Sequence, residues 1–114
     1  MCIDYRKVNA VTYKDAYPIP KIDACLDALG DSRYFSSLDL RQGYWQAEIV
    51  DSHRDKTAFV TRRGQFRFKV LPFGLCNAVG LFQRLQDSVL AGLNWFICLV
   101  YLDDIAVFSR TFDE

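Results

Sequence analysis

Two short apolar runs near the end of the chain are separated by a pair of acidic residues. The first run, Ile97 to Leu102, is followed by Asp103 and Asp104, and the second extends from Ile105 to Phe108. Two such runs, separated by two residues that tolerate turn conformations, predict a β-hairpin. Another short strand is predicted over Tyr34 to Asp39, and it also ends in a carboxylate. Acidic residues therefore stand at the ends of two separate predicted strand regions.

Two other stretches have apolar residues at helical spacing. The first begins after Pro18-Ile19-Pro20 and closes at Gly30, which predicts a helix built on Ile22, Cys25, Leu26 and Leu29. The second follows Asn77, a residue suited to cap a helix, and extends to about Asn94. Its apolar stripe consists of Ala78, Phe82, Leu85, Val89 and Leu93. Core packing is the preferred interpretation of the first stripe.

The middle of the chain alternates apolar and polar residues. Trp45 to Ile49 predicts a half-buried strand, and a polar connection follows over Asp51 to Lys56. A second hairpin is predicted from Thr57 to Thr61 and from Phe66 to Val70, with Arg62 and Arg63 at its tip. A basic ribbon of this kind is able to contact phosphates. An ordinary solvated strand face explains the same pattern equally well.

The order of these elements predicts an α+β fold with a mostly antiparallel sheet and helices packed on one face. A chain of 114 residues with 51% hydrophobic residues is enough for one small globular domain. Apolar runs are too short to span a membrane, and the first residues do not resemble a signal peptide, so an intracellular protein without membrane contact is expected. Four separated cysteines and one histidine suggest no zinc site.

The charge balance limits how this chain binds nucleic acid. Lysine and arginine together number 14, as do aspartate and glutamate, so the net charge is zero. A neutral chain carries no global basic signal, and any contact with a nucleic acid must be local or must lie on other segments.

The adjacent acids Asp103 and Asp104 are an unusual choice for a simple turn. Two carboxylates about 4 Å apart repel by roughly 4 kcal/mol at an effective dielectric constant near 20. A hairpin that needed only a turn would be served better by Asn-Gly. A divalent cation would offset this repulsion, and a site made only of oxygen ligands favours Mg²⁺. An exposed turn without chemistry is the alternative, which the flanking apolar strands and Asp39 make less attractive.

Three segments resemble the ordered motifs of reverse transcriptases. They are FSSLDLRQGYWQ at 35–46, LPFGLCNA at 71–78 and YLDDI at 101–105. The resemblance is closest to the polymerases of long-terminal-repeat retrotransposons of the Gypsy/Ty3 type, and it extends from about Asp4 to the last residue. It implies a truncated reverse-transcriptase palm with a split β-α-β-like core. Residues 1–114 would form a single partial domain, in which residues 1–33 lead from the fingers into the palm and residues 34–114 carry the three motifs.

The resemblance also implies a chemistry. The protein would be an RNA-directed DNA polymerase, a nucleotidyltransferase that extends the 3′-hydroxyl of a primer during retrotransposon replication. Asp39, Asp103 and Asp104 would be its catalytic carboxylates and metal ligands, with the backbone carbonyl of Leu40 as a further ligand. The expected cofactor is Mg²⁺, with Mn²⁺ as a substitute, in a two-metal mechanism. The expected partners are an RNA or DNA template with its primer, and deoxynucleoside triphosphates.

Residues around the nucleotide and the primer follow from the same resemblance. The nucleotide-binding positions would be Tyr44, Phe73, Gly74 and Gln83. Tyr44 lies five residues after Asp39, where an aromatic ring excludes a 2′-hydroxyl by its bulk, although a core aromatic is an equally good interpretation. Tyr101 is expected beside the primer end, and Arg62 and Arg63 are the candidate primer or template contacts.

Two departures from the family pattern suggest an alternative. Val79-Gly80-Leu81 stands where relatives have Pro-Ala-Thr, and Gly80 costs up to about 1 kcal/mol in a helix interior. The fingers residues that grip the triphosphate would precede residue 1, and the thumb and ribonuclease H portions of a polyprotein would follow residue 114. We therefore expect negligible polymerase activity from this chain alone. The alternative is a non-catalytic remnant of a retroelement, folded or partner-binding; in an active element, a cytoplasmic virus-like particle is expected.

Overall fold

The computed structural model describes residues 2–113, which fall into two compact units. The first unit contains the described residues up to 16 together with residues 42–82, and the second contains residues 17–41 and 83–113. Each unit therefore combines two segments that are separated along the chain. Helix α4, Ala78–Val89, begins in the first unit and ends in the second.

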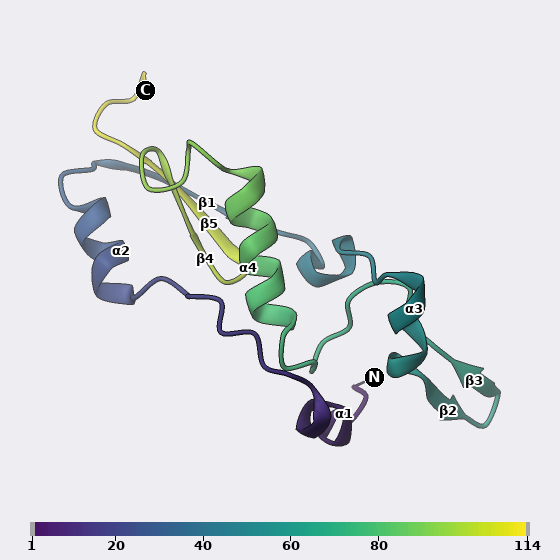
Figure 1. The fold of residues 1–114 in the computed structure, drawn as a ribbon. Coiled ribbons are helices and arrows are strands. Elements are labelled where there is room, and N and C mark those ends of the chain that lie inside the picture. The colour runs from purple at the N-terminus through teal and green to yellow at the C-terminus, as the bar shows by residue number, and fades with distance from the viewer. Residues whose placement is uncertain (1, 114) are drawn as a thin grey trace. The chain divides into compact units, whose positions relative to one another are not determined.

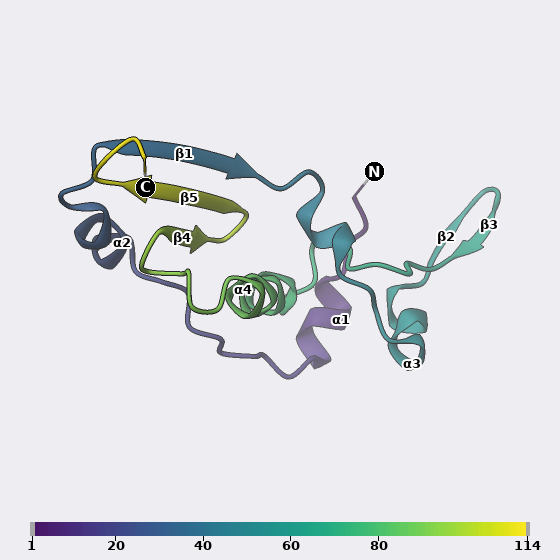
Figure 2. The ribbon, with the colours of Figure 1, turned by 90° about the horizontal axis from the view of Figure 1, so that it is seen from above.

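The second unit is built on a three-stranded antiparallel sheet in the order β1-β5-β4 (Figures 1 and 2). These strands are β1, Tyr34–Asp39, β4, Cys98–Tyr101, and β5, Asp104–Ser109. The apolar run in β4 is buried at Cys98, Leu99 and Val100, whereas every residue of β1 is exposed. This sheet confirms the predicted α+β fold with antiparallel strands.

The acidic hairpin is displaced by one residue from the predicted turn. Tyr101 pairs with Asp104 across β4 and β5, so the two connecting residues are Leu102 and Asp103, and Asp104 is the first residue of β5. The prediction that Asp103 and Asp104 both lie in the turn was wrong. Leu102 takes the left-handed backbone conformation, with φ of 56°. Leucine rarely adopts this conformation, and the sequence pattern therefore predicts aspartates at the turn positions.

The first unit contains short elements only. They are α1, Arg6–Val11, the 3₁₀ helices η1, Gly43–Gln46, and η2, Asp55–Thr57, the short helix α3, Asp51–Arg54, and the hairpin of β2, Phe59–Thr61, with β3, Gly64–Phe66. The predicted second hairpin is confirmed with shorter strands and a tighter turn at Arg62 and Arg63. Helix α1 was not predicted, and the predicted polar connection over Asp51 to Lys56 is mostly helical.

The strand predicted over Trp45 to Ile49 was wrong. Gln42 has a left-handed backbone with φ of 55°, and the chain then enters the 3₁₀ helix that places Trp45 and Gln46. Only Glu48 keeps a β-bridge, which it forms with Val70. Of the apolar residues in the predicted alternation, only Ala47 is buried, whereas Trp45 is exposed, so this segment does not form a continuous pleat.

Both predicted helices are present as α2 and α4, but α4 differs from its prediction in its N-terminal cap and in its last residue. Helix α2, Ile22–Leu29, ends at Gly30 as predicted, but none of its residues is buried, so the core-packing interpretation of its apolar stripe was wrong. Helix α4 runs through Gly80, so the departure from the family pattern does not interrupt it, and it stops at Val89 rather than near Asn94. The side chain of Asn77 does not cap α4. Its Nδ2 donates to the carbonyl oxygen of Tyr13 at 2.8 Å, and its Oδ1 accepts from the amide of Asp15 at 3.0 Å.

Within residues 2–113, no helix has both the length and the apolar character to cross a lipid bilayer.

Candidate active site

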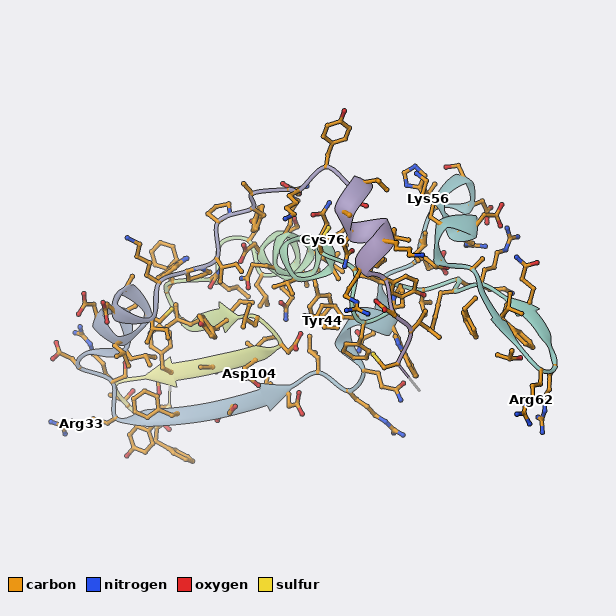
Figure 3. The ribbon with its side chains drawn as sticks, turned by 90° about the horizontal axis from the view of Figure 1, so that it is seen from below. Arg33, Tyr44, Lys56, Arg62, Cys76 and Asp104 are labelled. Carbon is orange, nitrogen blue, oxygen red and sulfur yellow. The ribbon has the colours of Figure 1, made fainter. Side chains whose placement is uncertain are left out.

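Asp39 and Asp104 lie directly opposite each other at one end of the three-stranded sheet. They are the last residue of β1 and the first residue of β5, and they form the terminal pair of the antiparallel register (Figure 2). Figure 3 shows Asp104 at this position, where β5 begins beside the end of β1. Directly opposed residues project to the same face of an antiparallel sheet, with their Cβ atoms about 4.5–5.5 Å apart. The backbone therefore brings two of the three candidate carboxylates together.

Asp103 places the third carboxylate in the adjacent turn. Its Oδ1 is buried and has no hydrogen-bond partner. A buried carboxylate oxygen without a partner carries a desolvation cost that a cation would remove. With Asp39 and Asp104 at the neighbouring pair, the available donors are all oxygen atoms, which is the donor set that Mg²⁺ and Mn²⁺ prefer.

The side chains of Asp39, Asp103 and Asp104 do not form a closed metal cluster in this structure. Among residues 2–113, no three His, Cys, Asp or Glu side chains are gathered closely enough to hold a metal ion. The strand register and the unpartnered Asp103 oxygen fit a divalent cation, and the side chains of Asp39 and Asp104 are exposed at that end of the sheet.

Two more of the predicted residues lie at this end of the sheet. Tyr101 is the last residue of β4 and is the partner of Asp104, so Tyr101, Asp104 and Asp39 form one row across the three strands. Leu40 follows Asp39 directly and is half-buried.

Gln83 lies against the acidic hairpin from helix α4. Its side chain is completely buried, its Oε1 accepts from the amide of Leu102 at 3.0 Å, and its Nε2 donates to the carbonyl oxygen of Val100 at 3.3 Å. The resemblance to reverse transcriptases predicts that Gln83 lies near the nucleotide. In this structure its side chain offers no surface for a nucleotide to touch.

Asp87 connects Gln83 to two other segments of the same unit. Its Oδ1 accepts from Nε2 of Gln83 at 3.3 Å and from Nδ2 of Asn94 at 2.9 Å, and its Oδ2 accepts from the Tyr17 hydroxyl at 2.7 Å. The hydrogen bond to Asp87, reinforced by burial and by the Asp87 charge, raises the pKa of Tyr17. Sequence reasoning missed this group, because neither Asp87 nor Tyr17 belongs to a motif. The helical spacing of Gln83 and Asp87 was its only signal.

The remaining predicted nucleotide-binding residues belong to the first unit. Tyr44 is buried and packs edge-on against Phe73, with ring centroids 5.1 Å apart, and its ring lies tilted against that of Phe82 at the same centroid distance. Gly74 has a left-handed backbone with φ of 94°, and its carbonyl oxygen accepts from Nδ2 of Asn9 at 2.8 Å. Oδ1 of Asn9 in turn accepts from the amide of Cys76 at 2.9 Å, so this asparagine holds the loop from both sides.

Arg62 and Arg63 form the two-residue turn between β2 and β3, and Figure 3 shows Arg62 at the tip of that hairpin. With Phe59, Thr61 and Phe66 they line a shallow hollow. Both arginines are exposed.

Comparison with known protein families assigns this chain to one family. The family described as "Reverse transcriptase (RNA-dependent DNA polymerase)" matches residues 1–114. The chain is 46% identical over 113 residues to the Retrovirus-related Pol polyprotein from transposon opus of Drosophila melanogaster, covering 99% of this chain and 11% of that protein. It is 44% identical over 110 residues to the corresponding polyprotein from transposon gypsy of the same organism, covering 96% and 11%.

A shorter relative and a solved structure agree with this match. An RNA-directed DNA polymerase homolog of Oenothera berteroana is 47% identical over 109 residues, covering 96% of this chain and 77% of the relative. The foamy viral protease-reverse transcriptase in complex with RNA/DNA hybrid superimposes with a TM-score of 0.85 at 28% identity, covering 96% of this chain and 15% of that one. The chain thus spans about a tenth of the transposon polyproteins that it matches.

Proposed function

Because this chain belongs to the reverse transcriptase (RNA-dependent DNA polymerase) family, we propose that Asp39, Asp103 and Asp104 form the divalent-cation site of a nucleotidyl transfer reaction. The observation that carries the proposal is the terminal pair of β1 and β5. That pair sets Asp39 opposite Asp104, next to a turn whose Asp103 oxygen is buried without a partner. Three carboxylates are concentrated at one end of a short sheet, where fold stability alone would not favour them.

Each residue has a distinct part in the proposed site. Asp39 and Asp104 hold the cations from two strands, and Asp103 contributes the oxygen that lacks a partner. The carbonyl of Leu40 is a further candidate ligand. A bound pair of divalent cations would supply acidification of the primer hydroxyl and neutralisation of charge on the transferring phosphate. The protein's own contribution is to hold the carboxylates and to position the substrates.

The substrates follow from the family and from the foamy viral relative, whose structure holds an RNA/DNA hybrid. For this chain we propose an RNA or DNA template with its primer and a deoxynucleoside triphosphate. Tyr44, Phe73 and Gly74 would line the nucleotide, Tyr101 would lie at the primer end, and Arg62 and Arg63 would contact phosphates. The buried ring of Tyr44 is supported on Phe73 and Phe82, which is the rigidity that exclusion of a 2′-hydroxyl requires.

Binding of Mn²⁺, measured by the loss of its free electron paramagnetic resonance signal, tests the site. The unsubstituted chain is expected to bind Mn²⁺, and Asp103→Asn is expected to weaken binding at least about tenfold. Asp27→Asn is the control, because Asp27 is an exposed carboxylate on α2 in the same unit. Equal binding by both variants, or none by the unsubstituted chain, would favour the non-catalytic remnant.

Primer extension with Mg²⁺ tests the activity separately. We propose that this chain, which spans a small part of its polyprotein relatives, extends a primer negligibly by itself. Robust extension by the 114-residue polypeptide would show that the chain already contains the substrate-gripping elements.

A further inference from the structure

The side chain of Gln83 bonds to the backbone on both sides of Tyr101, where β4 passes into the Leu102–Asp103 turn. Its amide oxygen accepts the Leu102 N–H at 3.0 Å, and its amide nitrogen donates to the Val100 carbonyl at 3.3 Å. Val100 lies in β4 and Leu102 is the first residue of the turn, so one side chain restrains the backbone on both sides of Tyr101. The side chain of Gln83 is 0% exposed, which protects these bonds from competition by water.

The orientation of this amide is fixed by its surroundings. Nε2 also faces Oδ1 of Asp87 at 3.3 Å, so both of its hydrogens point at acceptors. Reversing the amide would set Oε1 against the Val100 carbonyl and the Asp87 carboxylate, and would set Nε2 against the Leu102 N–H. The Asp87 carboxylate is itself held by hydrogen bonds from the Tyr17 hydroxyl and from Nδ2 of Asn94. The Leu102 N–H therefore donates to Oε1 of Gln83, an acceptor whose orientation is fixed.

The restrained residue has an unfavourable backbone conformation. Leu102 has φ of 56°, a conformation that leucine adopts at a cost, and Asp103 follows it directly. The backbone at Leu102 sets the direction in which the Asp103 side chain leaves the turn. We propose that Gln83 is a positioning residue, which holds the Leu102–Asp103 turn so that the Asp103 carboxylate is directed to the divalent-cation site. This inference rests on the proposed function.

The same helix supplies a matched control. Gln86 lies one turn after Gln83, its side chain is 4% exposed, and neither its amide nitrogen nor its amide oxygen has a hydrogen-bond partner within the described chain. Replacing either glutamine by methionine removes a buried amide and keeps a side chain of similar length. Only Gln83→Met also removes the restraint on the turn.

Two readouts on the 114-residue chain separate positioning from folding. Hydrogen exchange followed by nuclear magnetic resonance reports on the Leu102 amide, with the Val107 amide in β5 as the folding check. The dissociation constant for Mn²⁺ reports on the site. Gln83→Met is expected to accelerate exchange at Leu102 and to weaken Mn²⁺ binding by about tenfold. Gln86→Met is expected to leave both within about twofold, because its amide makes no hydrogen bond.

Several results would overturn the inference. Equal Mn²⁺ affinity in Gln83→Met and Gln86→Met would do so, even with faster exchange at Leu102, because Gln83 would then be structural only. If Gln83→Met fails to fold, Gln83→Glu replaces it, because burial beside Asp87 keeps the new carboxyl group protonated. One oxygen then still accepts the Leu102 N–H, and the hydroxyl donates to the Val100 carbonyl or to the Asp87 carboxylate. Gln83→Glu is expected to retain Leu102 protection, and its loss would also overturn the inference. If the proposed function itself is wrong, the unsubstituted chain and Gln86→Met will bind no Mn²⁺. That result differs from failure of this inference alone, in which both of them and Gln83→Met bind Mn²⁺ equally well.

Discussion

Asp39 is the cross-strand partner of Asp104 in the last pair of strands β1 and β5. Like charges directly opposed in a sheet destabilise it, by about the same amounts as opposite charges stabilise it. The sheet therefore places an unfavourable pair at its end, beside a third acid in the turn. This is the arrangement expected where a carboxylate site is held ready for a cation at some expense in stability.

Neutralising one member of the pair is expected to stabilise the chain without metal. Asp104→Asn removes the repulsion from Asp39 and should raise the free energy of unfolding by about 0.2–1 kcal/mol in the presence of a chelator. Millimolar Mg²⁺ should stabilise the unsubstituted chain and have a smaller effect on Asp104→Asn. Urea unfolding under both conditions measures this. A loss of stability in the chelator would show that Asp104 has a favourable partner instead.

Branching at residue 102 is expected to disturb the turn. Leu102→Val places a β-branched side chain at positive φ and should reduce the free energy of unfolding by about 1 kcal/mol or more. Leu102→Met is the control, because methionine is unbranched at Cβ and similar in volume. Urea unfolding of the two variants compares them at the same position. Equal stability would mean that the left-handed conformation of Leu102 is not maintained.

Thr57 is expected to anchor the first unit through its hydroxyl. Its Oγ1 donates to the carbonyl oxygen of Arg54 at 2.7 Å and accepts from the amide of Phe68 at 2.9 Å, and the side chain is nearly fully buried. Thr57→Val keeps the shape and leaves both groups without a partner, at a cost of about 1–3 kcal/mol. Hydrogen exchange at Phe68 should accelerate in Thr57→Val and stay slow in Thr57→Ser. Slow exchange in both variants would refute the anchor.

Alkaline pH is expected to remove the contribution of Tyr17. The pKa of Tyr17 is raised by its hydrogen bond to Asp87, so its value in the folded chain lies above the unfolded value of 10.0. The stabilisation is fully present below the unfolded pKa and is lost as pH rises through the folded pKa. Tyr17→Phe lacks this contribution at every pH.

The difference in unfolding free energy between the unsubstituted chain and Tyr17→Phe should be constant below about pH 10 and shrink above it. Tyr13→Phe is the control, because it removes the hydroxyl of a tyrosine that is 97% exposed. A difference that stays constant through the alkaline range would contradict the role of the Tyr17 hydroxyl.

Sequence patterns predicted the parts of the fold that rest on local periodicity. Helix α2 follows from one apolar stripe closed by Gly30, and β1 follows from a short strand-like segment that ends in a carboxylate. The acidic hairpin was predicted one residue out of register. Local preference favours aspartates in a turn, whereas the pairing of Tyr101 with Asp104 moves Leu102 into it.

Long-range contacts explain what the sequence did not reveal. The left-handed conformation of Leu102 is accompanied by a hydrogen bond to Gln83, 19 residues away, and no periodicity reports such a pair. Asn77 has the residue type of a helix cap, yet its amide bonds to the backbone of Tyr13 and Asp15. In both cases a polar side chain bonds to backbone groups far along the chain, and such long-range hydrogen bonds override local preference.

A Mg²⁺ titration followed by carboxyl carbon resonances tests the central claim most directly, namely that Asp39, Asp103 and Asp104 hold a common divalent cation. The three side-chain carboxyl resonances are expected to move together at millimolar Mg²⁺ and to fit one shared set of dissociation constants, while that of Asp27 on helix α2 stays in place. Three resonances that remain unmoved, or that shift no more than that of Asp27, would contradict the account.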